Sequence, residues 1–257
     1  MIDIHPTAVI SEGAQIGPSA VVGPYCVIGP DVSVGDGTRL MSHVVMDGHT
    51  TIGKNCTVFP FACIGKQTQD LKFKGDKTFV EIGDETTIRE YVTVNSGTNE
   101  GETTRVGSNC HIMAYSHVAH ACTVGDRVIM ANCATLAGEV DVEADAILGG
   151  LVAVHQFCRV GRMCIIGGCT KITQDAPPFM TVDGHPAAVR GLNLVGLKRK
   201  GFDAKALKLL KEAYRCLYRS DLSTSSAVEK IKAEVESSAE IEHLLSFVSA
   251  SQRGIIK

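Results

Sequence analysis

Residues 4–40 read IHPTAVISEGAQIGPSAVVGPYCVIGPDVSVGDGTRL, and every sixth residue of this stretch, from Ile4 onward, is aliphatic. The register continues in the same phase to Ile172, and 26 of its 29 positions hold Ile, Val, Leu or Met. A six-residue period is typical of a solenoid, in which each unit buries its apolar face only by stacking on its neighbours. We therefore expect a mainly β solenoid over this register, whose only polar positions are Asp70, Asp76 and Glu100.

A second register holds small or β-branched residues at the fifth position of each six-residue unit, or hexad. The large aliphatic residue would fill the interior of a narrow prism, and the small residue would fit its tight corner. This pattern resembles the left-handed parallel β-helix of hexapeptide acyltransferases, in which three hexads form each coil. The left hand is implied by that resemblance, because ordinary crossover rules favour the right hand.

The cysteines follow the same pattern. At the small position of a hexad, Cys behaves as a small hydrophobe. The chain contains no CxxC pair, so we expect neither a disulfide framework nor a metal site. This usage fits a reducing compartment. Six of the ten cysteines occupy the small position: Cys26, Cys56, Cys110, Cys122, Cys158 and Cys164.

Composition excludes other classes of protein. The chain has 25 Lys and Arg against 28 Asp and Glu, and its net charge of −3 argues against a nucleic-acid partner. The first hexad starts at Ile4, which leaves no room for a signal peptide, and no apolar run reaches the length of a membrane span. We therefore expect a cytoplasmic protein without an integral membrane segment.

Two polar segments, 67–80 and 97–105, interrupt the register and return the chain to the same phase. We predict that they are loops projecting from a finished coil, and loops on a rigid scaffold commonly carry binding residues. The period ends after Ile172, and apolar residues then recur at helical spacing. These changes predict a β-helix domain over 1–190 and a C-terminal helical domain over 191–257, with helices near 203–219, 225–235 and 239–250.

Histidines supply the candidate chemistry, because no phosphate-binding loop and no serine-nucleophile motif is present. His120 is third in its hexad, where its side chain should point outward. With three hexads in each coil, Gly138 lies over His120, and Glu139 lies over Ala121. Adjacent coils are about 4.8 Å apart. We therefore expect one compact patch that contains a possible base, an acid, an amide and bare backbone: His117, His120, Gly138, Glu139, His155 and Gln156.

At these residues the chain closely resembles the acyl-carrier-protein–UDP-N-acetylglucosamine O-acyltransferases, which begin lipid A biosynthesis. The resemblance spans essentially the whole chain. Its most specific strings are QDLK at 69–72, HVAHAC at 117–122, and GLN at 191–193 followed by GLKR at 196–199. The resemblance implies an acyl carrier protein as donor, a UDP-sugar as acceptor, no cofactor, and a homotrimer with sites at subunit interfaces.

The resemblance also implies roles for individual residues. His120 matches the general base that takes the proton from the sugar 3-hydroxyl as it attacks an acyl thioester. Gly138 matches the residue whose N–H is the oxyanion donor. Gly168 matches a position that limits the length of the acyl chain, and glycine there implies room for a long chain. The positions expected to line the substrate groove are Gln69, Asp70, Lys72, His117, His155, Gln156, Asn193, Arg199 and Lys200.

Two residues depart from the family pattern. Well-known members carry an acidic or amide residue after the base, and here it is Ala121. Many carry His after the oxyanion glycine, and here it is Glu139. Our hypothesis is that Glu139, stacked over Ala121, orients His120 as part of the catalytic set. The alternative is that Glu139 contacts the sugar and favours a 3-amino acceptor.

Three other functions stay open at this stage. A zinc enzyme of the γ-carbonic-anhydrase type would space two ligands HxxxxH, whereas this chain has HxxH at 117–120. A non-catalytic solenoid would show flat ladders of Thr or charge without specific loops. An N-acyltransferase of the same pathway would carry an additional N-terminal domain. The basic cluster 198–200 fits either a nucleotide or an acidic carrier protein.

Overall fold

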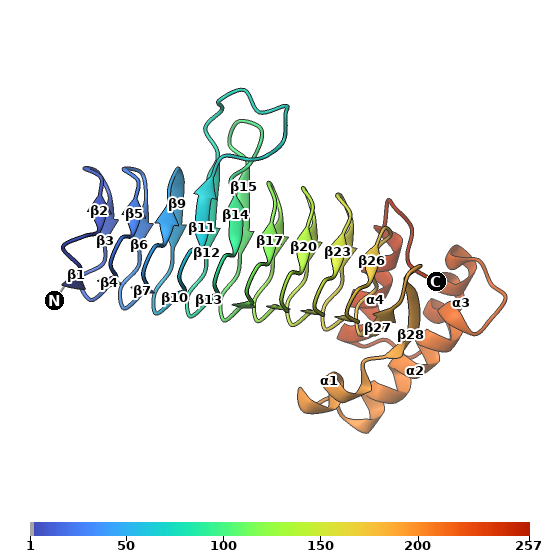
Figure 1. Cartoon of the computed structure of the whole chain (residues 1–257). Helices are drawn as coiled ribbons and strands as arrows, with labels where there is room; N and C mark the ends of the chain where they lie inside the picture. Colours follow the sequence, from blue (N-terminus) through green and yellow to red (C-terminus); the bar gives the residue numbers. More distant parts are fainter. Residues whose placement is uncertain (1–2) are drawn as a thin grey trace.

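The computed structural model describes residues 3–257 and shows a three-sided prism of stacked coils with a helical tail at one end (Figure 1). The prism is a left-handed parallel β-helix, which confirms the predicted fold class. Each coil contributes one short strand to each of three sheets, and the pairs between successive coils are parallel. Most strand partners are separated by three hexads, as in the pairing of His117 with Thr135.

We call the three sheets A, B and C in the order in which the chain visits them. Sheet A comprises β1 Asp3–Ile4, β4 Val21–Val22, β7 Arg39–Leu40, β10 Thr57–Val58, β13 Thr87–Ile88, β16 His111–Ile112, β19 Ile129–Met130, β22 Ile147–Leu148, β25 Ile165–Ile166, β27 Met180–Asp183 and β28 Ala188–Leu192. Sheet B comprises β2 Val9–Ile10, β5 Val27–Ile28, β8 Val45–Met46, β11 Cys63–Lys66, β14 Thr93–Asn95, β17 His117–Val118, β20 Thr135–Leu136, β23 Ala153–Val154 and β26 Lys171–Ile172. Sheet C comprises β3 Gln15–Ile16, β6 Ser33–Val34, β9 His49–Ile52, β12 Phe79–Ile82, β15 Thr103–Val106, β18 Thr123–Val124, β21 Asp141–Val142 and β24 Arg159–Val160.

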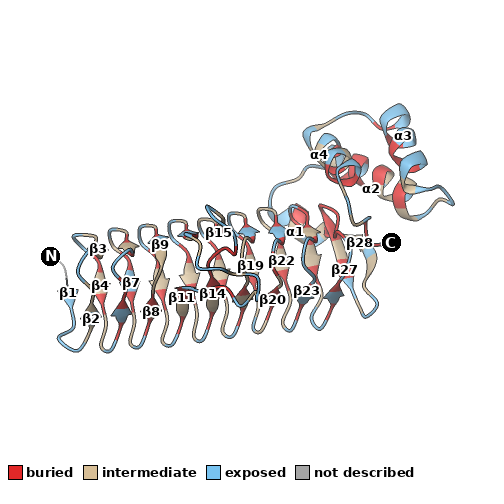
Figure 2. Cartoon of the chain, turned by 90° about the horizontal axis from the view of Figure 1, so that it is seen from above, coloured by how far each residue is buried: buried red, intermediate tan, exposed pale blue. Residues whose placement is uncertain are grey.

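The interior of the prism holds the two registers found in the sequence. The aliphatic residue that ends each two-residue strand points inward, and from Val22 to Ile172 these residues are almost completely buried (Figure 2). The small residues at the corners are equally buried, including Cys122 and Cys164. Most corners turn through a residue with a left-handed backbone, such as Ala121 with a φ of 53°.

The two polar segments lengthen individual coils and project from the same edge of the prism (Figure 1). Ile52 pairs with Ile82, so the first segment adds two hexads to the three of an ordinary coil. Val94 pairs with Val118, so the second segment adds one hexad. Both loops lie on the edge at which sheet B passes into sheet C. His120 follows β17 on that same edge.

The tail contains α1 Leu194–Arg199, α2 Ala204–Tyr218, α3 Thr224–Glu234 and α4 Ala239–Ser249. The four helices are capped by the side chains of Asn193, Asp203, Ser223 and Ser238. The last residues then return to the coil, where the Ile256 N–H donates to the Asp175 carbonyl over 2.9 Å. Within residues 3–257, no helix is both long enough and apolar enough to cross a membrane.

Candidate active site

His120 stands on the edge between sheets B and C with its imidazole over Gly138 of the next coil. A Cβ atom added to Gly138 would overlap the ring, with only 2.9 Å to its Cδ2 and less to Cε1 and Nε2. The backbone of Gly138 is not left-handed, and Ala144 occupies the equivalent turn position after β21. Glycine is therefore required at position 138 because His120 lies there, as the coil arithmetic predicted.

The three backbone N–H groups next to this contact differ in whether they donate a hydrogen bond. The Ala137 N–H donates to the Val154 carbonyl, and the Glu139 N–H donates to the His120 carbonyl, both over 3.0 Å. Among residues 3–257, the Gly138 N–H between them has no backbone acceptor. This amide is thus available to an oxygen atom placed beside His120.

Asp70, from the first loop, faces the imidazole. Its Oδ2 lies 3.8 Å from His120 Nε2, and the two side chains are 24% and 16% exposed. His120 Nδ1 is buried and has no hydrogen-bond partner within the described chain. Nε2 is therefore the ring nitrogen that faces the loop and a possible substrate.

His117 lies beside His120 and is held by a residue that the sequence did not single out. Its Nδ1 is 2.7 Å from the hydroxyl of Thr93, which lies directly opposite in the parallel register of β14 and β17. Burial lowers the pKa of His117, and the neighbouring His120 lowers it further. His117 is thereby kept neutral at pH 7. The second loop lengthens the intervening coil by one hexad, and this concealed the pair from a count of three hexads per coil.

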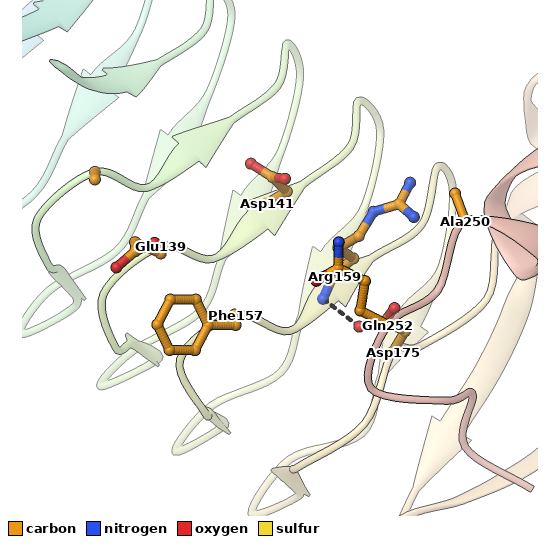
Figure 3. Close-up of a pocket in the computed structure, with 8 residues that line it drawn as sticks. Glu139, Asp141, Phe157, Arg159, Asp175, Ala250 and Gln252 are labelled. Atoms are coloured by element: carbon orange, nitrogen blue, oxygen red, sulfur yellow. Dashed lines mark hydrogen bonds between the residues drawn. The ribbon is translucent and has the colours of Figure 1, made fainter. Parts of the chain in front are cut away.

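Glu139, for which the sequence predicted an orienting role, follows Gly138 at the corner of the coil. Within residues 3–257, no ion pair or hydrogen bond joins its carboxylate to His120, and the carboxylate beside the ring belongs to Asp70. Glu139 instead lies with Ala121 in the wall of a cavity of about 360 Å³ between the coil and the returning tail (Figure 3). The same cavity is lined by Asp141, Phe157, Arg159, Asp175, Ala250 and Gln252.

The other residues predicted for the groove fall into two groups. Gln69 and Lys72 flank Asp70 on the first loop, and His155 and Gln156 are exposed two coils beyond His117. Gly168 lies at the opposite edge of sheet B, directly before β26. A Cβ atom there would meet only the carbonyl oxygen of Gly150 at 3.2 Å and its nitrogen at 3.9 Å.

Asn193, Arg199 and Lys200 are not near His120 in the same chain. Asn193 Nδ2 donates to the Met163 carbonyl over 3.0 Å, and Lys200 Nζ donates to Asp145 Oδ1 over 2.7 Å. Met163 and Asp145 both lie on the edge between sheets C and A. One chain therefore displays the predicted nucleotide-binding residues and His120 on two different edges of the prism.

The cysteine next to this site belongs to the core. Cys122 is fully buried, and burial raises the pKa of its thiol to about 12. A thiol with so high a pKa supplies almost no thiolate near neutral pH. Cys122 therefore has the environment of a core residue and not that of an activated thiol.

Comparisons with known proteins match both parts of this architecture. Residues 103–138 match the bacterial transferase hexapeptide model, residues 4–99 match the GMPPB C-terminal domain, and residues 175–256 match domain 2 of UDP N-acetylglucosamine O-acyltransferase. An acyl-[acyl-carrier-protein]–UDP-N-acetylglucosamine O-acyltransferase of Thermodesulfovibrio yellowstonii is 50% identical over the full length of both chains. The corresponding protein of Verminephrobacter eiseniae is 45% identical, again over both full lengths.

Solved structures agree with these sequence matches. LpxA from Acinetobacter baumannii superposes with a TM-score of 0.95 at 40% identity and covers 99% of each chain. LpxA from Bacteroides fragilis, a UDP-N-acetylglucosamine acyltransferase, gives a TM-score of 0.96 at 40% identity over 99% of this chain and 100% of its own.

The stacked hexads and the histidine packed over a glycine amide define a hexapeptide-repeat acyltransferase. Full-length identity of 45–50% places the chain within one family of that class. It belongs to the acyl-[acyl-carrier-protein]–UDP-N-acetylglucosamine O-acyltransferases, as its sequence motifs predicted.

Proposed function

We propose that this protein transfers a (R)-3-hydroxyacyl chain from acyl carrier protein to the 3-position of UDP-N-acetylglucosamine, the first step of lipid A biosynthesis. The observation that carries the proposal is the packing of the His120 ring over Gly138. This packing supports the proposal because an imidazole and an unpaired amide lie on adjacent coils, which are about 4.8 Å apart. The relatives of similar sequence are named as O-acyltransferases that act between an acyl-[acyl-carrier-protein] and UDP-N-acetylglucosamine.

His120 is the general base in this proposal. Its Nε2 accepts the proton of the sugar 3-hydroxyl while the oxygen attacks the thioester carbonyl, and Nδ1 keeps its own proton in the buried position. The protonated ring then returns that proton to the departing carrier thiolate. Asp70 stabilises the transient imidazolium from 3.8 Å. No bond forms between the enzyme and the acyl group.

The N–H of Gly138 is the oxyanion donor. The tetrahedral intermediate carries its negative charge on the former carbonyl oxygen, and one preorganised donor of this kind contributes about 3 kcal/mol to transition-state stabilisation. The amide is free of other backbone partners, so it binds the oxyanion without first breaking a hydrogen bond.

Gly168 sets the end of the acyl groove in this proposal. Three steps along sheet B, from β17 to β26, separate the coil of His120 from that of Gly168. At about 4.8 Å per step this is roughly 14 Å, a distance suited to a long extended chain. Glycine leaves that end of the path open, since no side chain projects there.

We propose a homotrimer, because sheet B and its edge with sheet A expose apolar side chains. Rings on this edge stack from coil to coil with centroids 4.8–5.0 Å apart, from His43 through Phe61 and Tyr91 to Tyr115. Tyr25, Phe61, Tyr91, Tyr115 and Leu151 are all exposed in the single chain. An apolar strip of this length is typical of a protein interface. Sheet C instead points charged side chains outward, such as Glu81, Arg105, Asp141 and Arg159.

A trimer also completes the groove. Arg199 and Lys200 lie on the edge between sheets C and A, whereas His120 lies on the edge between B and C. In a ring of three copies, the first edge of one subunit can face the second edge of the next. The basic residues of one subunit would then bind the nucleotide whose sugar reaches His120 of its neighbour, and the exposed Lys198 next to them would meet the acidic carrier.

Acyl transfer tests the proposal directly. A panel of 3-hydroxyacyl carrier proteins is offered with UDP-N-acetylglucosamine or its 3-amino analogue, and wild type is compared with His120→Ala. We expect transfer to the 3-hydroxyl that His120→Ala reduces at least a hundredfold. Preference for the amine would refute the 3-hydroxyl as the acceptor group. Transfer that survives His120→Ala would refute the base, and no transfer to either acceptor by folded enzyme would refute the function.

A further inference from the structure

Two buried hydroxyl groups join the two inserted loops. Thr68 Oγ1, in the first loop, lies 3.2 Å from Thr98 Oγ1, in the second. The two residues are only 4% and 3% exposed, although both belong to loops rich in polar residues. A buried hydroxyl without a partner is costly, so each hydroxyl fixes the position of the other.

The same Thr68 hydroxyl holds the backbone of Asp70. It accepts the Asp70 N–H over 3.1 Å, and Asp70 Oδ1 accepts the Lys72 N–H over 2.9 Å. The aspartate is therefore held at its amide and at one carboxylate oxygen. Its second oxygen, Oδ2, is the atom that faces His120 Nε2.

Glu102 holds the other half of the contact. Its Oε2 accepts the N–H groups of Thr98 and Asn99 over 2.8 and 3.0 Å, which folds the second loop into a tight turn. A Cβ atom on Gly97 would lie 2.5 Å from that of Glu102, so the turn is also closely packed. Burial opposes the charge of Glu102, but hydrogen bonds from the Asn99 side chain and from the two N–H groups, together with the nearby His120, outweigh it and lower the pKa of the carboxyl. Glu102 is thus ionised and able to hold Thr98 throughout the neutral range.

We propose that Thr68, Thr98 and Glu102 are positioning residues that form a latch between the loops and keep Asp70 directed at His120. They act through Asp70 and touch neither substrate nor the reacting atoms. The inference rests on the proposed function, because it assigns Asp70 to the imidazolium formed during transfer. It adds three residues to the machinery of the reaction and explains why the second loop, which supplies no proposed substrate ligand, is folded against the first.

A double-mutant cycle tests the latch by kinetics. Thr98→Val keeps the shape of the side chain and removes its hydroxyl, and a displaced Asp70 should lower kcat about tenfold with KM for the sugar nucleotide changed less than threefold. Thr98→Ser, which restores the hydroxyl, should stay within about twofold of wild type. In an Asp70→Asn background, Thr98→Val should have less than about a twofold effect. Additive losses would overturn the proposal.

Hydrogen exchange tests the latch without substrate and so separates it from the proposed function. In Thr98→Val and Thr68→Val, exchange in residues 67–72 should accelerate about tenfold as the Asp70 amide loses its fixed acceptor. Thr38→Val is the control, since the buried Thr38 hydroxyl also makes two hydrogen bonds, to Gly53 and Cys56, far from the loops. It should leave these residues unchanged. Unaltered exchange in both loop variants would refute the latch even if wild type transferred no acyl chain.

Discussion

His243 Nε2 lies 2.7 Å from Glu143 Oε2, and this pair fastens helix α4 of the tail to sheet C of the coil. The same carboxylate accepts the Arg162 N–H over 2.7 Å, and Arg159 approaches its other oxygen to 3.6 Å. Arg159 in turn stacks on Phe247 of α4, with 4.1 Å between its guanidinium carbon and the ring centroid. One carboxylate therefore joins helix α4 to the coil through three partners.

Glu143→Gln should lower the free energy of unfolding by about 1–3 kcal/mol, because glutamine keeps one acceptor oxygen but removes the negative charge that faces Arg159 and the N–H groups of His243 and Arg162. Burial opposes ionisation of Glu143, but hydrogen bonds from His243 and Arg162 outweigh it and hold the pKa of the carboxyl below its ordinary 4.5. A carboxyl whose pKa is lower in the folded protein than in the unfolded chain stabilises the fold at pH values above its unfolded-state pKa. This contribution is lost as the pH falls through the folded-state pKa. The difference in unfolding free energy between wild type and Glu143→Gln, measured in urea, should therefore be largest at pH 6 and should decrease below about pH 4.5. A gap that is constant from pH 6 to 3 would contradict this assignment.

Gly138→Ala should lower kcat at least a hundredfold, because the added methyl group displaces the His120 ring from the oxyanion site. Ala144→Gly makes the reverse change at the equivalent turn position and should leave kcat within about twofold, at a cost of up to about 1 kcal/mol in stability. Steady-state kinetics and thermal unfolding of both variants check the prediction. A Gly138→Ala enzyme with normal kcat would show that the close contact has no catalytic consequence.

The periodic part of the molecule explains why so much could be predicted from the sequence. In a coil of fixed length, residues three hexads apart become neighbours, so Gly138 could be placed on His120 without coordinates. The same count placed Glu139 near Ala121, and both line one cavity. Prediction succeeded because each hexad fixes the direction of every side chain relative to the prism.

Counting three hexads per coil no longer identifies neighbours where inserted residues interrupt the six-residue period. Asp70 and Thr98 lie in inserted residues that have no register, and their contacts depend on loop folding that single-sequence patterns do not encode. The orienting role expected for Glu139 assumed that the nearest coil supplies the carboxylate beside His120, whereas a loop supplies it. Helix α1 was also missed, because so short a segment containing Gly196 shows no helical period.

Gly168→Leu should shift the preference of the enzyme toward donors with shorter acyl chains. The activity with short donors should be retained, and the activity with long donors should fall. The added side chain would project at the end of sheet B, where glycine now leaves contact only with Gly150. A panel of 3-hydroxyacyl carrier proteins of increasing length measures the change as the ratio of kcat/KM values. An unchanged chain-length profile would place the end of the groove elsewhere.

Cys122→Ala should retain kcat within about twofold and lose about 1 kcal/mol of stability, since the buried thiol fills a corner of the core and donates to the Ala137 carbonyl over 3.0 Å. With its pKa raised to about 12 by burial, Cys122 should resist iodoacetamide in the folded protein and should react once the protein is unfolded. Mass spectrometry of alkylated peptides compares the two states. Loss of transfer in a stable Cys122→Ala enzyme would reopen the question of a covalent intermediate.

Mixing two impaired variants should restore activity if the site is shared between subunits. His120→Ala lacks the base on one edge of the prism, and Arg199→Ala lacks a cation next to Lys200 on another. In trimers formed at random from equal amounts, each site draws His120 from one subunit and Arg199 from the next. Every trimer that contains both variants then has one intact site among its three. The two variants are co-expressed with different tags, purified through both tags and assayed at a low concentration of sugar nucleotide. Their activity should approach about a third of that of wild type. Trimers that are mixed only after separate purification provide the baseline. If both groups acted on a ligand within one chain, no mixture could contain an intact site, and recovery would be absent.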